Sequence, residues 1–441
     1  MKSRPLQLRF AAVAALATAL QFGSARLLVR DFNTPNASTD VARSLVATGH
    51  YSVPMGMRLW GLDSERAAEP LRYYVLPGEP LYLAAAFRFL PTALHPYIHI
   101  PVALLLLASV MVVAASIGGA RLALVTGLVA ALQPFVIFHG PVWDDTFLAA
   151  ALQWMALAIL ATSLTSDVVP PRRVWIVRAL GGASALGIAA VTRGDVQLFV
   201  FLLVLLTSIV PRLRPVRPLA ICCVAGALLT LAAWGARNHE AVGRFELGSS
   251  HDGVTLWESN GPHTADAISR GQVMMLSFDP ARMKPLWSST RTMDEVQANH
   301  YFRRRAIGFV VTHPIATVQT WARKSAYTLL AIRPELPLVS TRNLVGIASN
   351  MFTLALAAFG LVAVYRSRGH PHRAVPAAAL LVIPLVATGV ASILVGPIGA
   401  RYRIALDGVL WICAAHGLMR AADIARHGLG QRSAPSTAMP D

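Results

Sequence analysis

Carboxylate and guanidinium side chains recur at the ends of long apolar segments in this 441-residue sequence. The set consists of Asp31, Asp40, Asp144, Asp145, Arg193, Asp195, Arg237, Arg401, Arg403 and Asp407. A carboxylate can take a proton from a hydroxyl group, and the planar guanidinium of arginine can hold an oxyanion. Charged residues at the ends of apolar helices also simply mark where water begins. Ionisable groups at this depth are costly unless they are paired or used, so the set as a whole favours a site.

The composition predicts a polytopic membrane protein. The chain is 55% hydrophobic and only 14% charged, whereas about a quarter of the residues in a soluble domain are charged. The net charge of +17 could indicate nucleic-acid binding in a soluble protein. Here the arginines cluster in short loops between apolar segments, as the positive-inside rule describes, so no nucleic-acid partner is expected. An affinity for anionic lipid or for a phosphorylated substrate is compatible with the same charge.

Ten apolar segments are predicted to cross the membrane. They are Phe10–Val29, Pro101–Gly118, Leu122–Phe138, Thr146–Leu164, Val174–Val191, Val196–Val210, Leu219–Trp234, Val345–Tyr365, Val375–Val395 and Ile404–Met419. The first segment is interpreted as a retained span rather than a signal peptide, because no clean cleavage site follows it.

Two long segments that lack a span are predicted to form large loops. The first, 31–99, contains Leu76–Leu90, which is too short to span and is typical of a helix at the membrane surface. The second, 237–344, contains the apolar piece Ala306–Ile332, which Pro314 interrupts, and it is interpreted as interfacial helices. The expected organisation is an N-terminal membrane module (1–236), the second loop (237–344), C-terminal membrane helices (345–421) and a cytoplasmic tail (422–441).

The distribution of Lys and Arg predicts the orientation of the chain. Most of these residues in short loops fall on one side, whereas the three short turns on the other side contribute only Arg193, Arg401 and Arg403. The positive-inside rule then places both termini in the cytoplasm. Both large loops and the ten carboxylate and guanidinium residues at the ends of the apolar segments are expected on the outer face.

Five passages in this order resemble the polytopic GT-C glycosyltransferases that use polyprenyl-phosphate sugars, a group that includes protein O-mannosyltransferases (glycosyltransferase family 39) and lipid A aminoarabinose transferases. Asp40–Tyr51 is similar to the pattern of the first loop, and Leu76–Tyr82 is similar to "PPGYPL". Trp143–Phe147 resembles "SEXLF", and Trp234–Asn260 resembles "WXXRN…GXF…GXXLWXGN". Ala400–Ile404 resembles "RYRLP". The resemblance implies an all-α, GT-C-like bundle of about ten transmembrane helices with two large extracytoplasmic loops.

The resemblance also implies an activity. A sugar would pass from a polyprenyl-phosphate-linked donor to a lipid, glycan or protein acceptor at the outer face of a bacterial cytoplasmic membrane. Such a transfer needs a general base for the acceptor and cations for the departing phosphate. The candidate bases are Asp31, Asp40 and Asp145; the candidate phosphate ligands are Arg193, Arg237, Arg401 and Arg403; Asp144 and Asn238 are candidates for orienting the substrates. No cofactor and no metal-binding pattern is expected.

The sequence departs from the family pattern at the first-loop acid. Thr34 occupies its usual position, so either Asp31 or Asp40 replaces it, or the base is missing, and Asp31 is preferred because it follows the first span directly. Glu79 stands where the family has an aromatic residue. Two alternatives to the enzyme therefore stay open. One is a multispan transporter or flippase of a lipid-linked or anionic solute, although no internal repeat or polar mid-span group is evident. The other is an inactive GT-C-like scaffold.

Overall fold

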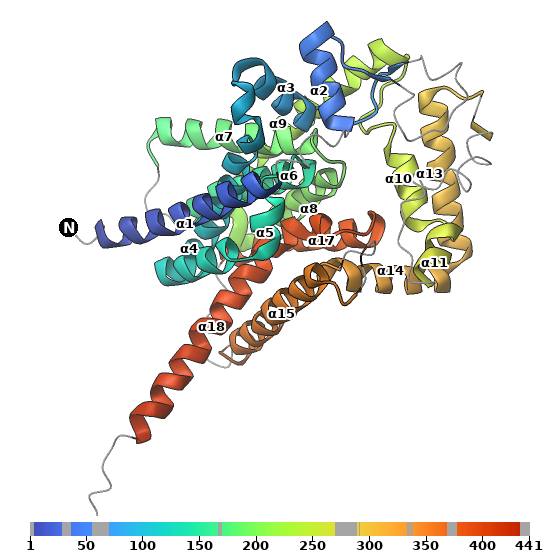
Figure 1. The fold of residues 1–441 in the computed structure, drawn as a ribbon. Helices are drawn as coiled ribbons and strands as arrows, with labels where there is room; N and C mark the ends of the chain where they lie inside the picture. Colours follow the sequence, from blue (N-terminus) through green and yellow to red (C-terminus); the bar gives the residue numbers. More distant parts are fainter. Residues whose placement is uncertain are drawn as a thin grey trace, which may run out of the picture.

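The computed structural model describes residues 4–28, 37–54, 70–165, 170–269, 289–290, 292–332, 336, 338–367 and 377–432. Within these ranges the chain is almost entirely helical (Figure 1). The exception is a small antiparallel ribbon in which β1 (Val53–Pro54) pairs with β2 (Pro70–Leu71). Asp31 and Thr34 lie outside the described residues.

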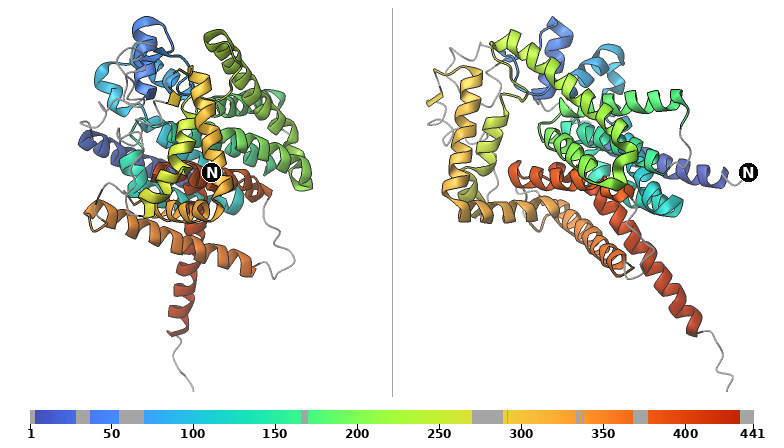
Figure 2. Two further views of the ribbon diagram at one scale, coloured as in Figure 1. Left: turned by 90° about the vertical axis from the view of Figure 1, so that its right-hand side faces the viewer. Right: turned by 180° about the vertical axis from the view of Figure 1, so that it is seen from behind.

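Long apolar helices form the main bundle (Figures 1 and 2). They are α1 (Arg4–Leu28), α4 (Ile100–Ala131), α6 (Asp145–Leu164), α7 (Arg172–Ala190), α8 (Asp195–Ile209), α9 (Arg217–Val242), α15 (Thr341–Ser367), α17 (Ile383–Val395) and α18 (Ile404–Arg432), with the shorter α5 (Pro134–His139), η2 (Pro211–Val216), α16 (Ala377–Leu380) and η4 (Ala400–Arg403) between them. Helix α6 packs against α4, α7 and α18 and buries Phe147 and Trp154 completely.

Helices α7 and α9 approach each other closely because small residues face each other between them. A Cβ atom added at Gly226 would lie 2.3 Å from the carbonyl oxygen of Ala183, and one added at Gly187 would lie 3.0 Å from that of Gly226. Small residues allow this close backbone contact, which is a common way for helices to associate within a membrane.

Eight helices within the described ranges are long and apolar enough to cross a membrane, and Asp195–Ile209 is a shorter apolar helix. The ten expected spans differ from this count in two places. Pro101–Gly118 and Leu122–Phe138 count as one there because they run together in α4, but the backbone of α4 leaves helical geometry at Gly118 and Gly119. A Cβ atom added at Gly127 would lie 2.6 Å from the sulfur of Met111, so the two arms of α4 fold back on each other as separate helical segments, and α5 follows the second. The other difference is α8, which has only 15 residues. The predicted all-α membrane architecture is confirmed.

The two expected loops contain short helices. The first holds α2 (Ala37–Thr48), α3 (Gly78–Phe89) and η1 (Thr92–Tyr97), so a helix is present as α3 within the segment 76–90 where one was expected. The second holds α10 (Asp252–Asn260), α11 (Pro262–Ser269), α13 (Glu295–Thr312) and α14 (Pro314–Leu329). Helix α13 ends at Thr312 and α14 begins two residues later at Pro314, which lacks the N–H that a continuous helix needs. Helices α10 and α13 pack together at the edge of the molecule (Figure 1).

A buried lysine attaches the second loop to the bundle. Lys324 of α14 is fully buried, and its Nζ donates to the carbonyl oxygens of Ser259 (3.0 Å) and Leu394 (2.8 Å). These carbonyls lie in the last turns of α10 and α17, where backbone acceptors lack a partner within the helix and carry partial negative charge. The junction therefore joins α10, α14 and α17.

Candidate active site

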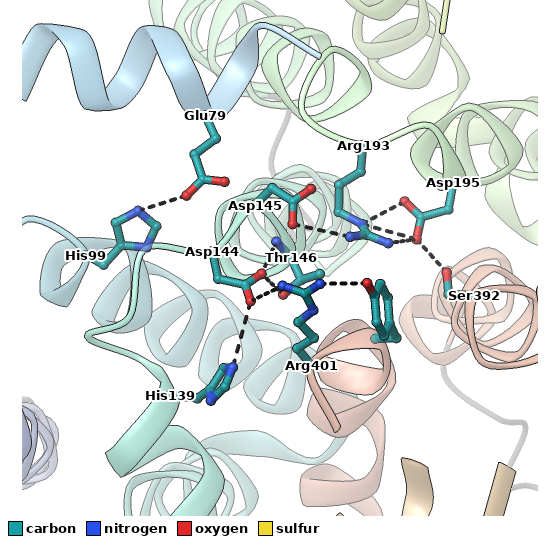
Figure 3. A network of polar contacts seen from close by, with 11 residues as sticks. Glu79, His99, His139, Asp144, Asp145, Thr146, Arg193, Asp195, Ser392 and Arg401 are labelled. Atoms are coloured by element: carbon teal, nitrogen blue, oxygen red, sulfur yellow. Dashed lines mark hydrogen bonds and ion pairs between the residues drawn. The ribbon is translucent and has the colours of Figure 1, made fainter. Parts of the chain in front are cut away.

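Asp144 opens helix α6 and anchors one side of a polar cluster (Figure 3). Its Oδ1 accepts a hydrogen bond from the backbone N–H of Thr146 at 2.8 Å and another from the Thr146 hydroxyl. This is the usual N-cap arrangement, and a negative charge there also interacts favourably with the helix dipole. Oδ2 of the same carboxylate lies 3.7 Å from Nε2 of His139, the last residue of α5.

Arg401 reaches Asp144 from the other end of the chain. It belongs to the short helix η4 before α18, and its Nη1 lies 3.3 Å from Oδ2 of Asp144. Its other terminal nitrogen donates to the Tyr402 hydroxyl at 2.8 Å. Burial alone would raise the pKa of Asp144, but Arg401, His139 and Thr146 together hold it well below its usual range. Asp144 is therefore a fixed negative charge that holds Arg401.

Arg193 forms the second cation of the cluster. It lies in the turn between α7 and α8, and it binds Asp195 at 3.0 Å and Oδ1 of Asp145 at 3.4 Å (Figure 3). Asp195 in turn accepts a hydrogen bond from the Ser392 hydroxyl of α17. Four segments distant in the sequence thus supply one network: the starts of α6 and α8, the end of α17 and the short helix η4.

The two neighbouring aspartates differ in exposure. The Asp144 side chain is 2% exposed, and both of its oxygens have partners. The Asp145 side chain is 38% exposed and contacts Arg193 through one oxygen. Asp145 therefore presents a carboxylate that a substrate hydroxyl can reach, whereas Asp144 is occupied by structural contacts. Arg401 (38% exposed) and Arg193 (16%) keep part of their guanidinium surface open for an anion.

A second acid approaches this cluster from α3. Glu79, in the first turn of α3, extends its side chain toward His99 and the two aspartates (Figure 3). Its Oε1 lies 3.6 Å from Nε2 of His99, and the two side chains are 3% and 0% exposed. The first turn of α3 is fixed against the Arg193 turn, because Gly78 N–H donates to the carbonyl of Val191 at 2.7 Å. A Cβ atom at Gly78 would collide with Thr192.

Arg237, expected to bind phosphate, makes its contacts elsewhere. It lies in the last turns of α9, and its guanidinium donates to the backbone carbonyls of Tyr51 (3.1 Å) and Arg72. It also stacks on the rings of Tyr51 and Trp234, with 4.9 and 5.2 Å to the centroids. Asn238 is fully buried and donates to the carbonyl of Glu246 at 2.7 Å. These contacts join α9 to both loops rather than to the aspartates of α6.

Arg403 is also committed to the fold. Its side chain is 3% exposed and lies 3.1 Å from Asp407, one helical turn later. It also donates to the carbonyls of Thr328 and Leu329 at the end of α14 and to the side chain of Asn350 in α15. Arg403 therefore joins α14, α15 and α18, and it offers little surface to a ligand.

One of the two first-loop acids lies within the described residues. Asp40 lies in α2, where its Oδ1 is 3.9 Å from Arg43. Asp31 falls outside the described residues. Of the sequence-predicted site residues, the structure thus brings together Asp144, Asp145, Arg193 and Arg401.

Four residues beside the network were given no role from the sequence: His139 and Ser392, which contact Asp144 and Asp195, and Glu79 and His99, which lie 3.6 Å from each other. The signal for Glu79 was present in the sequence: an acidic residue stands between Gly78 and Pro80 at the start of an otherwise apolar helix. The histidines and the serine carried no comparable signal. Within the described residues, no three His, Cys, Asp or Glu side chains group closely enough to hold a metal ion.

No known protein family and no curated protein matches the sequence. Solved structures do match the fold. The archaeal oligosaccharyltransferase AglB from Archaeoglobus fulgidus, in complex with an inhibitory peptide and a dolichol-phosphate, is 10% identical with a TM-score of 0.52. That alignment covers 100% of this chain and 53% of AglB. The complex of the same oligosaccharyltransferase with Zn and sulfate is 13% identical with a TM-score of 0.54 and coverages of 95% and 50%.

A third match, ArnT from Cupriavidus metallidurans bound to undecaprenyl phosphate, has a TM-score of 0.39 at 13% identity and covers 100% of this chain and 82% of ArnT. This score is too low to support an argument. The chain spans about half the length of the archaeal oligosaccharyltransferase. At these identities the likeness concerns the fold alone, and it agrees with the resemblance seen in the sequence. The chain therefore has the GT-C fold of polytopic membrane glycosyltransferases.

Proposed function

We propose that this chain is an integral-membrane glycosyltransferase that transfers a sugar from a polyprenyl-phosphate-linked donor to a lipid, glycan or protein acceptor. The reaction would take place at the outer face of a bacterial cytoplasmic membrane, the side on which charge distribution puts both large loops. The fold supports this class of activity. The observation that carries the proposal is the network of three aspartates (Asp144, Asp145 and Asp195) and two arginines (Arg193 and Arg401) at the starts of α6 and α8, in the turn before α8 and in η4 (Figure 3).

The proposed chemistry uses the two halves of the network differently. An acceptor hydroxyl attacks the anomeric carbon of the sugar while the bond between that carbon and the phosphate oxygen breaks. Asp145 takes the hydroxyl proton, because its carboxylate is the more exposed of the pair. Arg193 and Arg401 hold the polyprenyl phosphate as it leaves, since a guanidinium matches a tetrahedral oxyanion and stabilises charge that develops on it.

Asp144 has a positioning role in this proposal. It is buried, caps α6 and holds Arg401 at 3.3 Å, so it fixes the direction from which that cation meets the phosphate. Asp195 and Ser392 fix Arg193 in the same way. Arg237 and Arg403 are proposed to support the fold, because backbone carbonyls occupy their donors. Asp31, implied by the family resemblance, and Asp40 are alternative bases.

The test uses purified protein in detergent with a radiolabelled polyprenyl-phosphate sugar and a panel of acceptor lipids, glycans and peptides. Transfer of label to an acceptor, lost in Asp145→Asn, is the expected result. The same protein in liposomes separates transfer from transport. Movement of the lipid-linked sugar across the bilayer without transfer would favour the transporter alternative and contradict the proposal. Binding of the donor without either outcome would favour an inactive scaffold.

A further inference from the structure

Glu79 occupies an unusual electrostatic position for a carboxyl group. Its side chain is 3% exposed, and its Oε1 has no hydrogen-bond partner among the described residues. Its Oε1 lies 3.6 Å from Nε2 of the buried imidazole of His99. The nearby arginines are already bound to aspartates: Arg401 to Asp144, and Arg193 to Asp145 and Asp195. Among the described residues, no guanidinium forms an ion pair with Glu79 that would balance a charge on it.

The network already carries an excess of negative charge. Asp144, Asp145 and Asp195 supply three carboxylates against the two guanidinium groups of Arg193 and Arg401. An ionised Glu79 would make four against two in a buried setting, where an uncompensated charge is strongly disfavoured. An anionic ligand on the two arginines would then add to this excess.

The described residues place the following charged and titratable groups around Glu79. Asp144 and Asp145 face it from α6, Arg401 from η4 and Arg193 from the turn before α8. His99 faces it from the start of α4, and Tyr82 from α3 itself. His139 adds a contact on Asp144. Burial, followed by the charges of Asp145 and Asp144, raises the pKa of Glu79 well above its usual range, while Arg401 and Arg193 oppose the shift.

We infer that Glu79 is a protonated, neutral carboxyl group that sets the charge of the phosphate-binding site, and that its ionisation weakens binding of the lipid phosphate. Glu79 is a positioning residue in this account, since it acts through the charges of the aspartates and arginines. The inference rests on the proposed function, because it takes a polyprenyl phosphate as the ligand of Arg193 and Arg401. It explains why an acid is tolerated at a fully buried place beside two aspartates.

The test measures binding of undecaprenyl phosphate to the purified full-length protein in detergent between pH 7.5 and 10. The second phosphate pKa is about 6, so the charge of the ligand is nearly constant over this range. The expected result for the wild type is a Kd that rises up to about tenfold for each pH unit above the pKa of Glu79. In Glu79→Gln, which keeps the shape of the neutral acid, that rise should be absent and the Kd at pH 7.5 should match the wild type.

Failure of the proposed function and failure of the inference about Glu79 give different results in this experiment. Failure of the wild type to bind undecaprenyl phosphate at pH 7.5 would contradict the proposed function. Binding by the wild type with the same pH profile in Glu79→Gln would overturn the inference about Glu79 alone. If Glu79→Gln does not fold, calorimetry of the wild type in two buffers of different ionisation enthalpy supplies the same test. Uptake of up to one proton per bound lipid in the alkaline range is expected, and binding without proton uptake would contradict the inference.

Discussion

Arg237 was expected from the sequence to bind phosphate, whereas its contacts in the structure assign it to the stability of the fold, and the two roles predict different results for its substitution. We predict that Arg237→Gln destabilises the protein and leaves the affinity for undecaprenyl phosphate within about threefold of the wild type. The guanidinium donates to the carbonyls of Tyr51 and Arg72, and a charged hydrogen bond of this kind contributes about 1.5 kcal/mol at the lower end of its range. The contacts with the rings of Tyr51 and Trp234 add about 0.5 kcal/mol each.

The two hydrogen bonds and two ring contacts of Arg237 together stabilise the fold by about 4 kcal/mol. Arg237 is partly solvated and glutamine can keep some hydrogen bonds, so the expected loss of stability is about 2–4 kcal/mol. The assays are thermal unfolding in detergent and equilibrium binding of undecaprenyl phosphate. Arg244→Gln is the matched control: Arg244 lies 3.8 Å from Asp294 in an exposed pair, which contributes at most about 1 kcal/mol. A variant Arg237→Gln with an unchanged melting temperature and lipid binding weakened a hundredfold would refute this reasoning.

Three further predictions concern the network and the junction of α14 with the bundle. Arg401→Gln should lower kcat/KM for sugar transfer by about 10²–10³-fold, the usual effect of losing one donor to a developing oxyanion, and an unchanged rate in a steady-state assay would contradict the phosphate role. Asp145→Asn should lower the turnover rate by about 10²–10⁴-fold, the usual contribution of a general base, while Asp40→Asn stays near the wild type. If single-turnover measurements showed the loss in Asp40→Asn and not in Asp145→Asn, the base would be Asp40 of α2. Burial lowers the pKa of Lys324 to about 7 from an ordinary value of 10.5. Between these two values the unfolded chain binds one more proton than the folded one, so stability should rise by about 1.4 kcal/mol per pH unit as pH increases from 7 toward 10.5. Chemical unfolding of Lys324→Met over the same range should lack this rise, and an identical slope in both proteins would contradict the assignment.

The sequence predicted the helical membrane architecture because apolar length is a local property. The helix α3 and the break before Pro314 were predicted for the same reason. The number of spans was less accessible, because hydropathy alone does not give the length of each helix. Gly118 and Gly119 separate two apolar segments in the sequence, and in the structure they separate two arms of α4 that fold back on each other. The expected span 196–210 corresponds to α8, which has only 15 residues.

The candidate site was predicted in part. Asp144, Asp145, Arg193 and Arg401 stand at the ends of expected spans on one side, and the fold brings them together. The charge of a side chain and the side of the membrane on which it lies do not show whether its hydrogen-bond donors are already bound to other groups of the protein. Arg403 shares a five-residue passage with Arg401 in the sequence, yet carbonyls of α14 occupy it while Arg401 holds Asp144. Those contacts come from segments more than 70 residues apart, so they follow from tertiary packing alone.

The central claim is that Arg193 and Arg401 form the phosphate-binding part of a glycosyl-transfer site. Electron cryomicroscopy of the full-length protein with undecaprenyl phosphate tests this claim most directly. The account predicts that the phosphate lies within hydrogen-bonding distance of both guanidinium groups, with Asp145 on the side where the sugar would be attached. A phosphate bound at Arg237, with Arg193 and Arg401 still paired only to aspartates, would contradict it.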